Sequence, residues 1–358
     1  MLSRPRVRTP DVYQRLAPGG QQRSKAVGSM EQQQELLRIE DLQISIGKGE
    51  KPLRPVDRVS LEIPRHTVVG LVGESGCGKS MTAMSIMGLL GVNTRISGGR
   101  ILFEGEEISA ATPARMREIV GNSIAMIFQE PMTSLNPVVR VGKQVGEVLK
   151  LHTNLNAAQR KERVIEMFKQ VSIPEAEERY RAYPFQLSGG LRQRIMIAMA
   201  MICNPRLLIA DEPTTALDVT IEAQILHLMR QLKQEFDTSI LMITHNLGIV
   251  SELCDVVNVM YLGEIVEHAA TEALFETPMH PYTQGLIRSV PEIKESDEPL
   301  ENIPGMVPDL KHVPTGCRFC ERCRYATERC RREKPELTEA APGHQVRCFR
   351  CEAAKKEA

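Results

Sequence analysis

The stretch Gly73-Glu-Ser-Gly-Cys-Gly-Lys79-Ser80 decides the fold of this chain. It fits the P-loop pattern, in which glycines let backbone N–H groups surround phosphates while a lysine and a hydroxyl group reach the terminal phosphates and Mg²⁺. The apolar run 68–72 before it is typical of a buried strand. The run 82–87 after it is typical of a helix whose N-terminus faces the anion. The sequence therefore predicts an α/β nucleotide-binding domain.

A second motif is the apolar strand Leu207-Leu208-Ile209-Ala210-Asp211, which is followed directly by Glu212. In P-loop ATPases a carboxylate at the end of such a buried parallel strand holds Mg²⁺. We interpret Asp211 as the carboxylate that holds Mg²⁺ through water. Glu212 is then the candidate general base for the attack of water on ATP.

A third motif, Leu187-Ser188-Gly189-Gly190, opens a predicted helix whose two glycines expose backbone donors. Helix starts of this kind bind anions. One nucleotide needs only one phosphate cradle, so we infer that this second cradle serves the γ-phosphate of a nucleotide bound on a partner subunit. The apolar face that we expect for this helix consists of Leu191, Ile195, Ala198, Met199 and Ile202.

These segments together resemble the ATP-binding cassette family, over a region from about Leu37 to Glu267. Three further family motifs match: Gln129 in Met126-Ile-Phe-Gln-Glu-Pro, the triplet Ala216-Leu217-Asp218, and His245 in Ile243-Thr-His. In the family these are the Q-loop, the D-loop and the switch histidine. The resemblance implies a P-loop NTPase fold of the cassette type with a helical subdomain.

The resemblance and the motifs assign roles as follows. The catalytic residues are Glu212, His245 and Gln129, and the Mg²⁺-binding residues are Ser80, Gln129 and Asp211. The ATP-binding residues are Gly73, Glu74, Ser75, Gly76, Cys77, Gly78, Lys79, Ser80 and Ile46. Ile46 stands where the family has an aromatic residue on the adenine. We expect it to keep an apolar contact without stacking.

The composition agrees with one cassette plus a small appendage. The chain has 358 residues, of which 42% are hydrophobic and 25% charged, and its formal net charge is zero. This balance gives no field that would attract nucleic acid. No run of eighteen apolar residues occurs, which excludes a membrane-spanning helix.

The chain divides into four expected parts. Residues 1–34 form a basic leader that we expect to be disordered, either dispensable or mis-started, with a targeting segment as the alternative. Residues 35–289 form the cassette, with a helical subdomain at about 139–185. Residues 290–316 are a Pro-rich linker, and residues 317–358 form the Cys-rich extension.

Six of the nine cysteines lie in this extension: Cys317, Cys320, Cys323, Cys330, Cys348 and Cys351. Clustered thiols in a protein with cytosolic ATP chemistry indicate metal binding rather than disulfides. The segment resembles the C-terminal extension of oligopeptide and dipeptide importer ATPases, which is thought to hold a four-iron cluster. The family pattern matches Cys317, Cys323, Cys330 and Cys348, leaving Cys320 and Cys351 as extras. Zinc bound by two Cys-x-x-Cys pairs, and unligated thiols, remain alternatives.

The arginines between Arg318 and Arg332 have two interpretations. They could offset the negative charge of a thiolate cluster, or form a solvated basic surface.

The resemblance implies an ATPase subunit of a bacterial peptide importer, peripheral on the cytoplasmic face of the inner membrane. Its implied partners are a second and different ATPase subunit, two permeases and an external peptide-binding protein, and no nucleic acid. The cargo stays open among dipeptides, longer peptides, glutathione and a nickel chelate. A soluble cassette ATPase of DNA repair or ribosomes is the competing class, and it predicts tandem cassettes or basic composition. A non-catalytic regulatory cassette predicts the loss of Lys79 or Glu212, and both are present.

Overall fold

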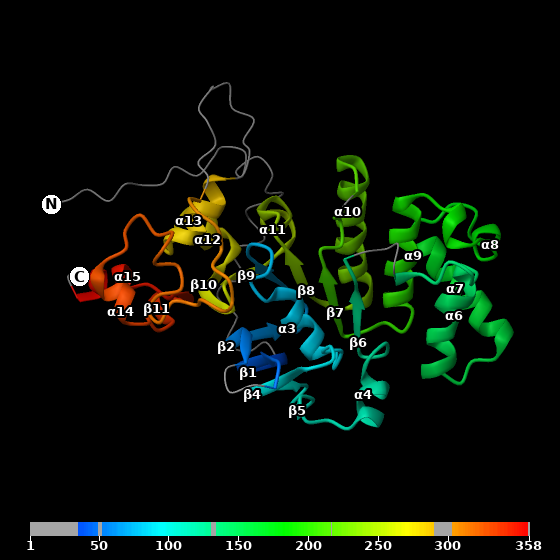
Figure 1. The fold of residues 1–358 in the computed structure, drawn as a ribbon. Coiled ribbons are helices and arrows are strands. Elements are labelled where there is room, and N and C mark those ends of the chain that lie inside the picture. The colour runs from blue at the N-terminus through cyan, green and yellow to red at the C-terminus, as the bar shows by residue number, and fades with distance from the viewer. Residues whose placement is uncertain (1–34, 49–51, 130–133, 216, 290–302, 357–358) are drawn as a thin grey trace, which may run out of the picture. The chain divides into compact units, whose positions relative to one another are not determined.

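The computed structural model describes residues 35–48, 52–129, 134–215, 217–289 and 303–356. The predictions for the leader, for residues 290–302 of the linker and for Ala216 lie outside these residues. The chain folds into two compact units (Figure 1). We call residues 35–64, 68–109 and 244–356 the P-loop unit, and residues 65–67 and 110–243 the signature unit.

The P-loop unit contains an antiparallel sheet in the order β2-β1-β4-β5. Its strands are β1 (Glu35–Ile46), β2 (Leu53–Pro64), β4 (Thr94–Phe103) and β5 (Glu106–Glu107). Apolar side chains that alternate along β1 and β2 are fully buried, as expected for a sheet with one face on the core. Ile46, the expected adenine contact, is half-buried at the end of β1 and pairs with Leu53.

The same unit contributes strands to a second sheet, in the order β11-β12-β10-β9-β3, of which β9, β10 and β11 are labelled in Figure 1. These are β3 (Val68–Val72), β9 (Val256–Tyr261), β10 (Glu264–Ala270), β11 (Thr338–Ala341) and β12 (His344–Val346). Strands β3 and β9 are parallel and every residue in them is buried. Strand β12 pairs with β10 in antiparallel fashion, so the Cys-rich extension adds two strands to the sheet of the cassette.

The helices of the P-loop unit flank these strands in sequence. They are α3 (Lys79–Ile86), α11 (Leu247–Leu253), α12 (Thr271–Glu276), α13 (Pro281–Arg288), α14 (Glu328–Arg332) and α15 (Phe349–Lys356). Helix α13 begins at a proline, and the His280 ring caps it by accepting a bond from the Tyr282 N–H. Burial lowers the pKa of His280 to about 4, so this cap stays neutral at physiological pH.

The signature unit contains three parallel strands in the order β8-β7-β6, and helices follow or precede each of them. The strands are β6 (Ile124–Ile127), β7 (Leu207–Asp211) and β8 (Ser239–Thr244). The helices are α4 (Pro113–Ile119), α6 (Val141–His152), α7 (Ala157–Gln170), α8 (Ala176–Arg179), η2 (Pro184–Gln186), α9 (Gly189–Met201) and α10 (Val219–Phe236). The described residues from 139 to 186 contain only helices and connections.

Helix α9 departs from the apolar face expected for it. Leu191 and Met199 are only half-buried, whereas Met196, Ile197 and Met201 are fully buried. Apolar residues surround most of this helix, so a single stripe could not be chosen from the sequence.

Candidate functional site

The P-loop connects β3 to α3 within the P-loop unit, and its glycines are required by close backbone packing. A Cβ on Gly73 would lie 2.1 Å from the Met260 carbonyl oxygen. Gly78 has a φ of +111°, and its Cβ would lie 2.5 Å from the Pro55 carbonyl oxygen. Only glycine can place the backbone this near to its neighbours, so the loop shape is set by these two positions.

Lys79 is the first residue of α3, and its side chain lies inside the loop. Its Nζ donates hydrogen bonds to the Gly73 carbonyl at 2.7 Å and to the Glu74 carbonyl at 3.0 Å. The residue is only 6% exposed. The Cys77 thiol beside it is buried, and this burial raises its pKa. The loop therefore presents one buried cation among backbone groups, as phosphate binding requires.

Glu74, Ser75, Gly76 and Ser80 complete the loop. Ser75, Gly76 and Ser80 are exposed, and Gly76 has no atom within 4 Å of its would-be Cβ. Glu74 is different, because its carboxylate is bound by Arg322 and its N–H donates to the Tyr282 hydroxyl. Neither partner could be predicted from the sequence around Glu74, since both lie more than two hundred residues away.

The catalytic candidates of the signature unit gather at the end of β7. Asp211 is buried there, and Glu212 follows it with a φ of +47°, which is an uncommon value for a glutamate. The Glu212 Oε2 accepts a bond from Gln129 Nε2 at 2.8 Å and one from Thr215 Oγ1 at 2.9 Å. The structure thus brings together Gln129 and Glu212, which are 83 residues apart. Thr215 is a partner that the sequence reading missed.

The signature residues open α9 in the same unit. The Ser188 hydroxyl accepts a bond from the Leu191 N–H and caps the helix, and Gly189 and Gly190 form its first turn. A Cβ on Gly190 would lie 3.0 Å from Ile221 of α10, so the turn packs close to that helix. Leu187 is buried before the helix begins.

Gln193 is a second residue that sequence reading missed. It is 1% exposed, and its amide donates to the carbonyl of Pro213, directly after Glu212. Gln193 stands between Arg192 and Arg194, so the sequence contains no signal for its burial. This bond connects the signature helix to the segment that carries the candidate base.

The remaining motif residues have these positions. Asp218 caps α10 by accepting a bond from the Ile221 N–H, and Leu217 precedes it. His245 is an exposed residue of the P-loop unit that directly follows β8 in sequence.

Five cysteines of the extension border one small pocket: Cys317, Cys320, Cys323, Cys330 and Cys348. Burial raises the pKa of Cys317 to about 12. A hydrogen bond from Cys351 lowers the pKa of Cys348 to about 7. Among the described residues, no three His, Cys, Asp or Glu side chains converge as a metal-ion site would.

Two arginines of the extension follow neither interpretation suggested by the sequence. Arg318 and Arg322 are buried, and their guanidinium groups bind carboxylates of the cassette. Their ion-pair partners are carboxylates rather than thiolates, and neither side chain forms an exposed basic surface.

Comparison with known proteins defines the class. Residues 56–215 match the ABC transporter family, and residues 266–330 match the C-terminal region of oligopeptide/dipeptide transporters. The fold resembles the ATP-binding cassette MJ0796 in a dimeric post-hydrolysis state bound to ADP and Pi. That match has a TM-score of 0.59 at 24% identity and covers 66% of this chain and 99% of the other. The chain is therefore an ABC-type ATPase.

Its relatives define the family within this class. The chain is 46% identical to the dipeptide transport ATP-binding protein DppD of Escherichia coli (strain K12), over 87% of this chain and 96% of that protein. It is 48% identical to the oligopeptide transport ATP-binding protein AppD of Bacillus subtilis (strain 168), over 88% and 96%. The chain belongs to the ATP-binding subunits of oligopeptide and dipeptide ABC transporters.

Membership confirms an activity of ATP hydrolysis coupled to peptide transport, and it does not support a soluble ATPase of DNA repair or ribosomes. It also implies membrane permeases and a substrate-binding protein as partners. Within the part of the chain that the structure describes, no helix has the length and apolar character needed to cross a bilayer.

Proposed function

We propose that this chain hydrolyses ATP on the cytoplasmic face of a bacterial inner membrane and energises peptide import through two permeases. The observation that carries the proposal is the presence on one chain of the ABC transporter region and of the C-terminal region of oligopeptide/dipeptide transporters. The relatives are named for dipeptides and oligopeptides, which supports peptides as the cargo class.

The roles of individual residues follow from their chemistry. The P-loop from Gly73 to Ser80 binds the phosphates, with Lys79 on the terminal ones and Ser80 and Asp211 on Mg²⁺. Glu212 takes the proton of the attacking water. Its bonds to Gln129 and Thr215 fix the carboxylate in one orientation, which a general base requires. Gln129 couples Mg²⁺ and the attacking water to the neighbouring surface. His245 hydrogen-bonds the γ-phosphate.

The second ATPase subunit is a different chain in this proposal. Ser188 and the two glycines that open α9 serve the nucleotide held by that partner. Apolar side chains also remain exposed in the signature unit, at Val138, Leu151 and Phe185. Such exposed apolar groups are typical of protein–protein contacts, and we assign them to the permease.

The Cys-rich extension holds an iron–sulfur cluster in this proposal. Cys317, Cys323, Cys330 and Cys348 all border one pocket, which supports a donor set there; Cys320 borders the same pocket, whereas Cys351 does not. A zinc ion held by four cysteine thiolates is the alternative. A four-iron cluster would be held by four such thiolates. Such a cluster supplies one-electron chemistry or structural support.

Purification tests the assignment to an importer. We expect the chain, extracted from membranes under anaerobic conditions, to copurify with two multi-span permeases and a second ATPase subunit. Mass spectrometry of the complex would identify each subunit and its stoichiometry. Recovery of the chain only from the soluble fraction, alone or with nucleic acid, would overturn the proposal. Recovery of a complex with two copies of this chain and no other ATPase subunit would refute only the heterodimer part of the proposal.

Elemental analysis tests the cluster. We expect about four iron and four sulfide per chain after anaerobic purification, with visible absorption that Cys317→Ser abolishes. Cys203→Ser is the matched control, because Cys203 lies outside the extension. One zinc per chain without visible absorption would contradict the iron assignment, and the absence of any metal would contradict both. The same measurement on Cys351→Ser decides whether that residue is a ligand.

A further inference from the structure

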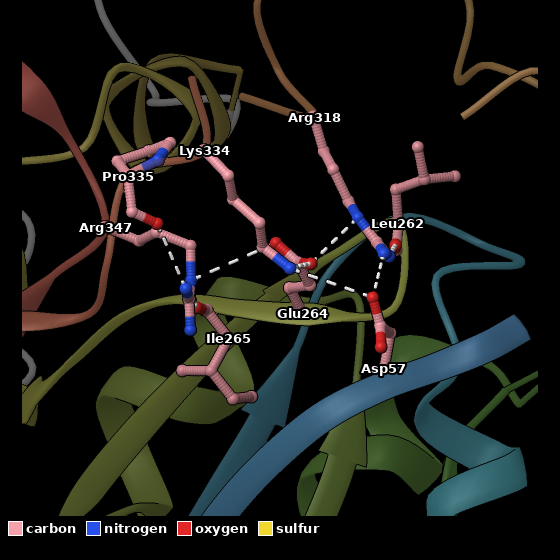
Figure 2. Close-up of polar contacts among 8 residues, drawn as sticks. All are labelled: Asp57, Leu262, Glu264, Ile265, Arg318, Lys334, Pro335 and Arg347. Carbon is pink, nitrogen blue, oxygen red and sulfur yellow. Dashed lines mark hydrogen bonds and ion pairs between the residues drawn. The ribbon is translucent and has the colours of Figure 1, made fainter. Parts of the chain in front are cut away.

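A cluster of charges joins the Cys-rich extension to the cassette within the P-loop unit (Figure 2). Arg318 Nε lies 2.9 Å from Glu264 Oε1, and its terminal nitrogens bind Asp57 and the Leu262 carbonyl. Lys334 pairs with Glu264 and lies 3.7 Å from Asp57. Arg347 donates to the Ile265 and Pro335 carbonyls.

Both acids of this cluster belong to the cassette, and all three cations belong to the extension. The Glu264 side chain is 2% exposed and the Asp57 side chain 13%. A buried carboxylate is strongly destabilising unless it is paired. The cassette therefore depends on the extension to neutralise its own buried acids.

This cluster reaches the P-loop through one turn. The turn between β9 and β10 contains Leu262 and Gly263, and Leu262 accepts the bond from Arg318. Gly263 N–H donates to the Cys77 carbonyl at 2.8 Å, and its own carbonyl accepts from Asp57 N–H at 2.9 Å. Arg318 thus supports the turn against which the P-loop rests.

A second contact is direct. Arg322 binds the carboxylate of Glu74 with both terminal nitrogens, at 2.6 and 3.0 Å. The Arg322 side chain is 5% exposed and the Glu74 side chain 29%, so the guanidinium group of this bidentate pair is buried while the carboxylate is partly exposed. The Glu74 N–H donates to the Tyr282 hydroxyl at 2.9 Å. Glu74 is therefore held at its backbone and at its side chain.

Aromatic packing fixes the position of this second contact. Phe319 lies between Arg318 and Arg322 in sequence and is 3% exposed. Its ring centroid lies 5.2 Å from that of Tyr261 and 5.4 Å from that of Tyr282. Arg318, Phe319 and Arg322 contact the P-loop or the residues that support it. Phe319 also borders the pocket lined by Cys317, Cys320 and Cys323.

We propose that Arg322 is a positioning residue of the ATP site, which sets the P-loop through Glu74 and couples ATP affinity to the cysteine-rich loop 317–323. It touches no reacting atom. It holds Glu74 in one conformation before ATP binds, so that ATP binding does not have to order the P-loop. This inference rests on the proposed assignment of residues 73–80 to ATP.

The test measures ATP hydrolysis by the intact transporter. We expect Arg322→Ala to raise the KM for ATP about tenfold, while kcat at saturating ATP stays within about twofold, because the loop can still be ordered by bound nucleotide. Lysine keeps the positive charge but cannot bind the carboxylate through two nitrogens. The KM of Arg322→Lys should therefore lie between those of wild type and Arg322→Ala. Arg332→Ala is the matched control, since Arg332 pairs with Glu328 on an exposed face of its own helix. It should leave KM unchanged.

A double-mutant cycle identifies the contact. Arg322→Ala and Glu74→Ala should each raise KM, and the double variant should be no worse than the more severe single variant. Additive effects, or a KM for Arg322→Ala within twofold of wild type, would overturn the proposal. Should Arg322→Ala fail to fold in a thermal melt, Glu74→Gln tests the same pair from the cassette side. Failure of the ATP assignment itself would appear separately, as unchanged ATP binding after loss of Lys79.

Discussion

Replacing Glu212 with glutamine will lower kcat for ATP hydrolysis by at least about 100-fold and leave ATP affinity within about twofold. Glutamine has the shape of glutamate and can still accept bonds from Gln129 and Thr215, which now bind Glu212 Oε2. It cannot take a proton from water. Phosphate release measures the loss of turnover, and equilibrium nucleotide binding measures the affinity.

The same variant should accumulate as an ATP-bound closed dimer, because the step that reopens it is blocked. Size-exclusion chromatography with and without ATP would detect this state. Glu235→Gln is the control, since Glu235 is an exposed residue of α10 outside the motifs. Turnover within tenfold of wild type in Glu212→Gln would exclude this residue as the general base.

Replacing Lys79 with alanine will weaken ATP binding by at least about 100-fold. Lys79 is buried and its Nζ already lies inside the P-loop, on the carbonyls of Gly73 and Glu74. Hydrogen bonds between charged groups contribute about 1.5–3 kcal/mol each, so losing two of them to the terminal phosphates accounts for this loss. Titration of the purified chain with ATP gives the dissociation constant.

Lys143→Ala serves as the control for this loss of charge. Lys143 is exposed on α6 and belongs to none of the nucleotide motifs. A thermal melt distinguishes lost binding from lost folding. ATP affinity of Lys79→Ala within tenfold of wild type would refute the assignment of the P-loop as the ATP site.

Local patterns in the sequence were sufficient for the central elements of the fold. The run 68–72 coincides with β3, and the run ending at Asp211 coincides with β7, because buried parallel strands are short and continuously apolar. The glycines of the P-loop were recognisable since few other residues tolerate those close backbone contacts.

Contacts between distant residues could not be predicted in this way. Nothing near Glu74 indicates that Arg322 binds it, since 248 residues separate the two. Nor does the composition of 338–346 indicate strands, because β11 and β12 are short and β10, with which β12 pairs, lies far away in sequence. The sequence suggests that the arginines of the extension either offset thiolate charge or form a solvated surface. In the structure, Arg318 and Arg322 instead bind acids of the cassette.

The pairing of β12 with β10 has a consequence for attempts to shorten this protein. Strand β12 covers backbone groups of β10 that would otherwise form an open sheet edge. Open edges of apolar strands invite pairing between molecules and aggregation. His344 of β12 also binds Glu267 of β10, which is fully buried. We therefore expect a chain that is cut before the extension to misfold and aggregate rather than to act as a minimal ATPase.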